Sequence, residues 1–165
     1  MPPRHPAPIS WLLTDSRLGS DLPGIVRRLP RGSGVVVRHH HLPPAERRAL
    51  LRRLRRLATG HGVKIVDDQG GCVARVHSAR ELCRALLRKP ELLFLSPLFA
   101  TRSHPDWQPL GHMRAAALVR MAKRPAMALG GMSARRYRQV RSLGFAGWGG
   151  IDAWTGRGWK KPSRE

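Results

Sequence analysis

Short apolar runs alternate along this chain with longer amphipathic segments, and this alternation limits the folds that the chain can adopt. The apolar runs predict strands at residues 11–15, 34–39, 63–68, 72–77, 92–96, 125–129 and 147–152. Segments with helical spacing lie at residues 21–28, 44–59, 79–87, 113–121 and 134–143. Strands that alternate with helices form parallel sheets with crossover helices, so the sequence predicts an α/β fold.

Local signals support several of these boundaries. Ser78 and Glu81 form the S-x-x-E pattern of a capping box at the start of one predicted helix. Ser133 is expected to cap the last helix, and Gly144 is expected to end it.

One connection does not fit a parallel sheet. Only Gln69, Gly70 and Gly71 separate the strands predicted at 63–68 and 72–77. Neighbouring parallel strands need a crossover of about a dozen residues. The two strands therefore either form an antiparallel hairpin, or one of them is much shorter than predicted.

Composition indicates one domain over residues 1–154, followed by a mobile basic tail at 155–165. An apolar fraction of 41% supports a packed core. No run approaches the roughly 18 apolar residues of a membrane helix, and residues 1–8 lack a signal-peptide pattern, so we expect a soluble, cytoplasmic protein. Cys72 and Cys83 have neither metal spacing nor a disulfide framework, and we expect both to be small buried or half-buried side chains.

The net charge of +21 raises the possibility of nucleic-acid binding. In the helix predicted at 44–59, however, leucines form one stripe and the arginines, Arg47 included, are expected on the solvated face. Aromatic residues are sparse and do not alternate with the basic ones, so no base-stacking platform is visible. The charge predicts non-specific contact with nucleic acid at low salt, not a dedicated binding surface.

Polar groups follow the apolar strand predicted at 92–96. The run LLFLSPLFATRSHPDWQPLG places Thr101, Ser103 and His104 in a loop closed by Pro and Gly. Small-molecule sites of α/β proteins lie on such loops, at the carboxyl ends of parallel strands. The adjacent His39, His40 and His41 cannot all bind one metal ion, because neighbouring strand residues point to opposite faces. Of these three, we expect His40 to face the site.

This loop and several other runs resemble the thiamine-phosphate synthase/TenI family over roughly residues 10–154. The loop matches the family pattern G-P-V-F-x-T-x-T-K-P…P-L-G, and WLLTD at residues 11–15 is similar to L-I-T-D. Arg38 matches the Arg of Q-L-R-x-K, Asp68 the Asp of I-N-D-R, and His77 the His of V-H-S. ALGGM at 128–132 is similar to A-I-G-G-I, and GWGGIDA at 147–153 to G-V-A-V-I-S-A.

The resemblance implies a (β/α)₈ barrel, but such barrels usually take more than about 200 residues and this chain has 165. We therefore expect an incomplete TIM-type barrel of about seven strands with one βα unit missing. Its exposed edge would be covered by the tail or by a second subunit, which makes a homodimer plausible.

The family joins a hydroxymethylpyrimidine diphosphate to a thiazole phosphate with Mg²⁺, releasing pyrophosphate. The resemblance implies diphosphate or substrate binding by residues at three strand ends: Arg38, His40, Asp67, Thr101, Ser103 and His104. It implies a metal ligand in Asp68, and a phosphate site made of Gly130, Gly131, Ile151 and Asp152. Without the resemblance, the two glycines could equally form a helix-capping turn, and Asp67 could be a solvated charge at a loop end.

Departures from the family pattern leave the activity open. The second family Asp lies in the missing segment, Arg75 stands where the synthases have a Ser, and Asp152 would repel a phosphate. His104 replaces a Lys and is cationic only when protonated. In TenI-type thiazole tautomerases, a His at position 77 is an acid/base group; alternatively, His77 only closes a strand. The possible functions are therefore a synthase of impaired activity, a tautomerase that needs no Mg²⁺, or a non-catalytic phosphate-ligand-binding protein. A basic nucleic-acid-binding domain is a weaker alternative.

Overall fold

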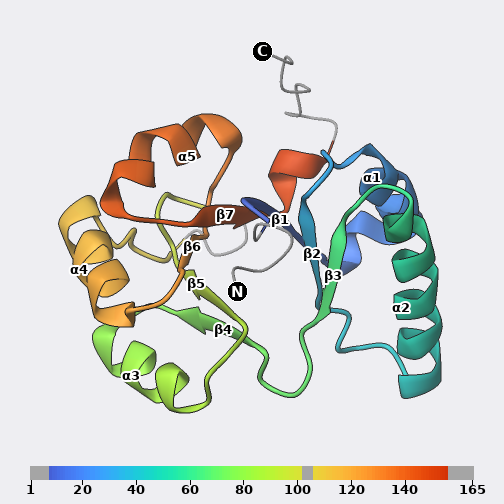
Figure 1. Ribbon diagram of the computed structural model, residues 1–165, viewed down its shortest axis with the longest axis horizontal. Coiled ribbons are helices and arrows are strands. Elements are labelled where there is room, and N and C mark those ends of the chain that lie inside the picture. Colours follow the sequence, from blue (N-terminus) through green and yellow to red (C-terminus); the bar gives the residue numbers. More distant parts are fainter. Residues whose placement is uncertain (1–7, 102–105, 156–165) are drawn as a thin grey trace, which may run out of the picture.

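The computed structural model describes residues 8–101 and 106–155, and over these residues seven strands form one parallel sheet. The strands are β1 (Ser10–Leu13), β2 (Gly34–Val37), β3 (Lys64–Asp67), β4 (Val73–Val76), β5 (Leu92–Leu95), β6 (Met127–Ala128) and β7 (Gly147–Gly150). Their order is β3-β2-β1-β7-β6-β5-β4, and every neighbouring pair is parallel. The sheet curls into an incomplete TIM-type barrel with helices around its outside, as expected (Figure 1).

The helices lie close to the predicted positions. They are α1 (Leu22–Arg28), α2 (Pro44–Thr59), α3 (Ala79–Leu87), α4 (His112–Ala122) and α5 (Ala134–Val140). Short 3₁₀ turns follow β1, α5 and β7: η1 (Ser16–Asp21), η2 (Arg141–Leu143) and η3 (Asp152–Trp154). None of the helices in the described part of the chain is long and apolar enough to cross a membrane.

The predicted caps are present. Ser78 Oγ accepts a hydrogen bond from the Glu81 amide, and Ser133 Oγ accepts one from the Arg136 amide. The Glu81 carboxylate accepts from the His77 amide at 2.9 Å, one residue earlier than in a standard capping box. Gly144 ends η2 in the left-handed region, with φ +97°. The Ser78 cap therefore also fixes the backbone of His77 where the chain leaves β4.

The short connection between β3 and β4 is accommodated at the opening of the barrel. The two strands are the edges of the sheet and do not pair, so the hairpin alternative is not adopted. The thiol of Cys72, just before β4, donates to the carbonyl oxygen of Asp67, the last residue of β3, at 2.6 Å. Burial raises the pKa of this thiol, which keeps the proton on sulfur. The contact between Cys72 and Asp67 places the start of β4 beside the carboxyl end of β3, and no crossover helix lies between the two strands.

Apolar side chains pack on both faces of the strands. One buried cluster fills the inside of the barrel and includes Trp11 and Phe94, whose rings meet edge to face at 6.5 Å. A larger cluster lies between the strands and the surrounding helices. A Cβ at Gly34 would lie 2.2 Å from the Trp11 ring, so this strand position must lack a side chain. The interior is therefore packed, and active sites of such barrels lie on the loops at the carboxyl ends of the strands.

Two expectations about individual side chains are wrong. Arg47 is buried, with 2% of its surface exposed, whereas the other arginines of α2 are exposed. It lies one turn into α2, on the side that faces the barrel, where it meets Asp67 of β3. Cys83 is exposed because it follows buried Leu82 in α3 and therefore projects from a different side of the helix.

Candidate active site

A cavity of about 1560 Å³ opens at the carboxyl ends of the strands. Loops after β1, β2, β5, β6 and β7 contribute to its lining, together with Arg75 of β4 and His77 just after it. The predicted site residues in its lining are Arg38, His77, Thr101, Gly130, Gly131, Ile151 and Asp152. Ser103 and His104 lie outside the described residues.

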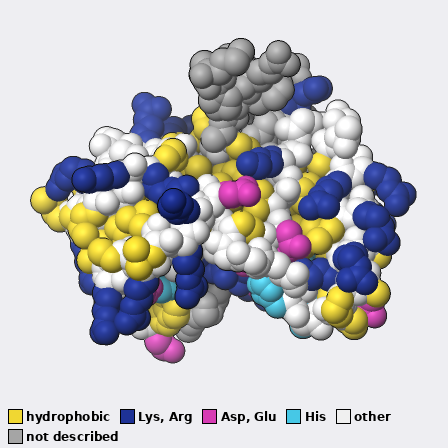
Figure 2. Space-filling view, turned by 60° about the horizontal axis from the view of Figure 1, so that its bottom comes forward, with side chains coloured by type: hydrophobic (Ala, Val, Ile, Leu, Met, Phe, Trp, Pro, Cys, Tyr) yellow, Lys and Arg dark blue, Asp and Glu magenta, His cyan; other side chains and the backbone are white. Residues whose placement is uncertain are grey.

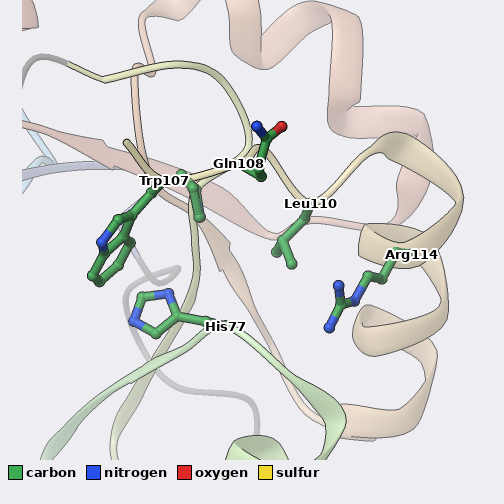
Figure 3. A pocket seen from close by; sticks show the side chains of 6 residues that line it. His77, Trp107, Gln108, Leu110 and Arg114 are labelled. Carbon is green, nitrogen blue, oxygen red and sulfur yellow. The ribbon is translucent and has the colours of Figure 1, made fainter. Parts of the chain in front are cut away.

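His77 is held in a defined orientation at this cavity. Its Nδ1 lies 2.9 Å from the carbonyl oxygen of Ser96 and 3.1 Å from Ser96 Oγ. A carbonyl oxygen only accepts hydrogen bonds, so Nδ1 carries a proton and the neutral ring keeps its lone pair on Nε2. The Trp107 indole meets the imidazole edge to face at 4.6 Å, and both rings also line a smaller adjoining pocket of about 340 Å³ (Figure 3). The ring is therefore positioned to move a proton through Nε2.

Four arginines make the cavity lining strongly basic. Arg17, Arg38, Arg75 and Arg136 all line it, against the two carboxylates of Asp15 and Asp152. Arg17 Nε pairs with Asp15 Oδ1 at 2.9 Å, and this hydrogen bond holds the pKa of Asp15 below its ordinary value. The lining thus carries more positive than negative charge, which suits an anionic ligand.

Arg38 is the least satisfied of these cations. Its side chain is half-buried, and in the described part of the chain its guanidinium makes no ion pair. Burial is the main cause that lowers the pKa of Arg38, and the like charge of Arg75 adds to it. Its backbone amide donates to Thr14 Oγ1 at 2.8 Å, and Thr14 Oγ1 also lies 3.0 Å from Nδ1 of buried His39. The backbone of Arg38 is therefore anchored to the chain that follows β1, whereas the Arg38 side chain lines the cavity.

Asp68, the predicted metal ligand, is already paired. Its Oδ2 lies 2.7 Å from Arg75 Nη1 and 3.3 Å from His40 Nε2, and its side chain is 5% exposed. His40 therefore lies at Asp68, at the opening between β3 and β4. Neither residue is part of the cavity lining, although Arg75 links them to it.

Asp67 points the other way. Its carboxylate pairs with Arg47 of α2, and the same guanidinium donates to the Val37 carbonyl at 3.0 Å. Successive residues at a strand end face opposite sides of the sheet, so Asp67 cannot join Asp68 in one site. Asp67 is therefore neither a ligand of the site nor a solvated charge at a loop end, the two roles considered from the sequence. It holds α2 against the barrel through Arg47.

Gly130 and Gly131 form a turn that approaches the loop after β5 closely. They have φ values of +90° and +59°. A Cβ at Gly130 would lie 2.6 Å from Pro97 Cα, and one at Gly131 would lie 2.4 Å from the Ala100 carbonyl oxygen. The Arg136 guanidinium donates to the Gly131 carbonyl and lies over the Phe99 ring. The glycines are therefore required for packing, and they also bring backbone to the cavity surface.

The residues present do not fit a Mg²⁺ site. Mg²⁺ prefers carboxylate oxygens supplemented by water and ligand phosphates. Asp68 already faces two basic groups, Asp67 lies on the other side of β3, and the described residues contain no cluster of three or more His, Cys, Asp or Glu that could hold a metal ion.

Sequence reasoning missed part of this site. It treated Arg75 as a departure only, and it assigned no role to Arg17, Arg136 or Ser96. A signal for Arg75 was available, because Arg75 and His77 are two residues apart in the β4 segment and alternate residues of a strand share a face. On the face shown in Figure 2, Lys and Arg lie on both sides, with hydrophobic and other residues between them.

Comparison with known proteins gives a family match over part of the chain and a fold over most of it. Residues 73–153 match the family described as thiamine monophosphate synthase. Thiamine phosphate pyrophosphorylase from Pyrococcus furiosus has a similar structure, with a TM-score of 0.74 and 20% identity, over 87% of this chain and 85% of that one. The Bacteroides thetaiotaomicron pyrophosphorylase gives a TM-score of 0.55 and 13% identity, over 89% of this chain and 84% of that one.

A structure described as native KDPGal is also similar, with a TM-score of 0.51 and 16% identity, over 97% of this chain and 90% of that one. No curated protein sequence matches the chain. At these identities the structural likenesses establish the fold, and the family match covers β4 to η3. The match over residues 73–153 supports a member of the thiamine-phosphate synthase/TenI family, and the solved structures show that the fold is shared over most of the chain.

Proposed function

We propose that the protein binds a phosphorylated thiazole carboxylate and isomerises it by proton transfer at His77, as the resemblance to TenI-type tautomerases implies. The observation that carries this proposal is the orientation of His77. Its Nδ1 donates to the Ser96 carbonyl, and no hydrogen bond to Nε2 is found among the described residues. A neutral imidazole held in this way has its basic nitrogen available to a ligand.

In this reaction a proton leaves one atom of the thiazole ring, and a proton is returned at another atom. The double bonds shift accordingly, and the composition of the molecule does not change. Nε2 of His77 would accept the first proton and then supply the second. Arginines of the cavity would hold the phosphate and carboxylate, and backbone at Gly130 and Gly131 would contact the phosphate. No step needs a metal ion, which agrees with the pairing of Asp68.

The test is isomerisation of the thiazole carboxylate phosphate, followed by the change in ultraviolet absorbance as the ring becomes aromatic. His77→Asn should lower the rate by about 100-fold or more, because general acid–base catalysis contributes about 10²–10⁴-fold. His61→Asn changes an exposed histidine beyond the end of α2 and is the matched control. Thermal shift with the ligand checks that the His77 variant still binds. A His77 variant that keeps its rate within about threefold would refute the proposed role.

A second candidate is the synthase reaction, favoured by the size of the cavity. Small-molecule pockets are usually about 300–1,000 Å³, and about 1560 Å³ leaves room for a pyrimidine diphosphate and a thiazole phosphate together. The test is to mix both substrates with Mg²⁺ and to measure thiamine phosphate after oxidation to a fluorescent product. Product that is lost in Asp68→Ala would favour the synthase over the isomerase. If neither reaction occurs but the ligands bind, the protein has a binding or regulatory role.

A further inference from the structure

The carboxylate that would hold a divalent cation in this family is paired with an arginine of the same chain. Arg75 Nη1 lies 2.7 Å from Asp68 Oδ2, and His40 Nε2 approaches the same oxygen at 3.3 Å. The Asp68 side chain is 5% exposed and that of Arg75 is 34% exposed, so water reaches the pair mainly from the side of Arg75. A cation could bind Asp68 only after displacing a charge-assisted hydrogen bond.

Arg75 also faces the cavity, and Arg38 faces it from the loop after β2. Together with burial, the larger cause, the charge of Arg75 lowers the pKa of Arg38, and the carboxylates of Asp15 and Asp68 each oppose this with a smaller effect. Arg38 is half-buried and has no carboxylate partner within the described ranges. Two like charges that converge on one cavity are stabilised by an anion between them, and a guanidinium binds phosphate oxygens in pairs.

We propose that Arg75 replaces the divalent cation of this site, so that a diphosphate or phosphate group binds to Arg75 and Arg38 without a metal ion. This inference rests on the proposed function in one respect, since it assumes that the cavity takes a phosphorylated ligand. It differs from the expectation derived from the family, in which Asp68 holds Mg²⁺. The two accounts make opposite predictions for metal removal and for loss of the Asp68 charge.

The probe is inorganic pyrophosphate, and its dissociation constant is measured by calorimetry at about 150 mM salt, where screening limits non-specific attraction to a basic protein. The unmodified protein should bind pyrophosphate in excess EDTA, and added Mg²⁺ should not tighten binding. Arg75→Ser should weaken binding in EDTA by about tenfold or more, the loss expected for a hydrogen bond to a charged group. Arg53→Ser removes the same charge from the exposed face of α2 and is the matched control.

Asp68→Asn provides the second variant. Under this proposal the substitution leaves Arg75 in place and makes the site more positive, so binding in EDTA should stay within about threefold or become tighter. If Asp68 were instead a metal ligand, binding would need Mg²⁺ and would fail in Asp68→Asn. Absence of pyrophosphate binding in EDTA, or equal effects of Arg75→Ser and Arg53→Ser, would overturn the inference.

The test of this inference and the test of the proposed function can succeed or fail independently. If isomerisation depends on His77 while pyrophosphate binding requires Mg²⁺, this inference fails and the proposed function stands. If pyrophosphate binds without metal but no isomerisation is found, the proposed function fails and this inference stands.

Discussion

A single methyl group added at Gly130 meets two separate penalties, so this position tests how rigidly the turn after β6 packs. Gly130 has φ +90°, and an alanine in the left-handed region costs about 1–2 kcal/mol. The added Cβ would lie 2.6 Å from Pro97 Cα, a backbone atom, and overpacking of this kind costs about 1–3 kcal/mol. The lower entropy of the unfolded chain returns about 0.4–1 kcal/mol. We therefore expect Gly130→Ala to reduce the free energy of unfolding by about 2–4 kcal/mol.

Urea unfolding followed by tryptophan fluorescence measures this loss, since Trp11 is buried in the barrel. Gly70→Ala is the control, because Gly70 has φ +74° but a Cβ there would meet nothing within 4 Å. It should cost about 1 kcal/mol from backbone strain alone. The difference between the two variants isolates the clash with Pro97. If Gly130→Ala costs no more than Gly70→Ala, the loop after β5 yields freely and the packing argument is refuted.

Three further predictions concern buried polar groups. Asp67→Asn should cost about 3 kcal/mol in urea unfolding, because it leaves buried Arg47 without its carboxylate. The double variant with Arg47→Met should regain most of this loss, and no recovery would argue against the ion-pair explanation. Burial lowers the pKa of His39, so its neutral form stabilises the fold above about pH 6.5 and this contribution is lost as the pH falls below that value. Stability measured against pH should therefore vary less in His39→Asn, and an unchanged profile would contradict this. Trp154→Phe should cost about 1–2 kcal/mol in thermal unfolding, because Trp154 Nε1 donates to the buried Trp11 carbonyl at 3.2 Å; a loss below about 0.5 kcal/mol would count against that hydrogen bond.

Local chemistry explains why the elements could be predicted. The bounds of α2 and α3 agree with the sequence because leucine spacing and the Ser78 cap are encoded within a few residues. The short loop at 69–71 correctly indicated that β3 and β4 are not joined as neighbouring parallel strands. It did not indicate that the two strands would be the unpaired edges of the sheet. Whether β4 pairs with β3 depends on where β4 begins in space, and in the structure it begins where Cys72 contacts Asp67.

The sequence by itself therefore determined the element types, the αβ alternation and the placing of polar groups at strand ends, because propensity, capping and apolar spacing act over short range. Only the tertiary structure decided which charges meet. It turned Asp67 outward to Arg47 and brought Arg75 to Asp68, two pairings between different elements. Charge pairing depends on distance through space, and the curl of the sheet, which depends on the packing of the whole barrel, sets that distance.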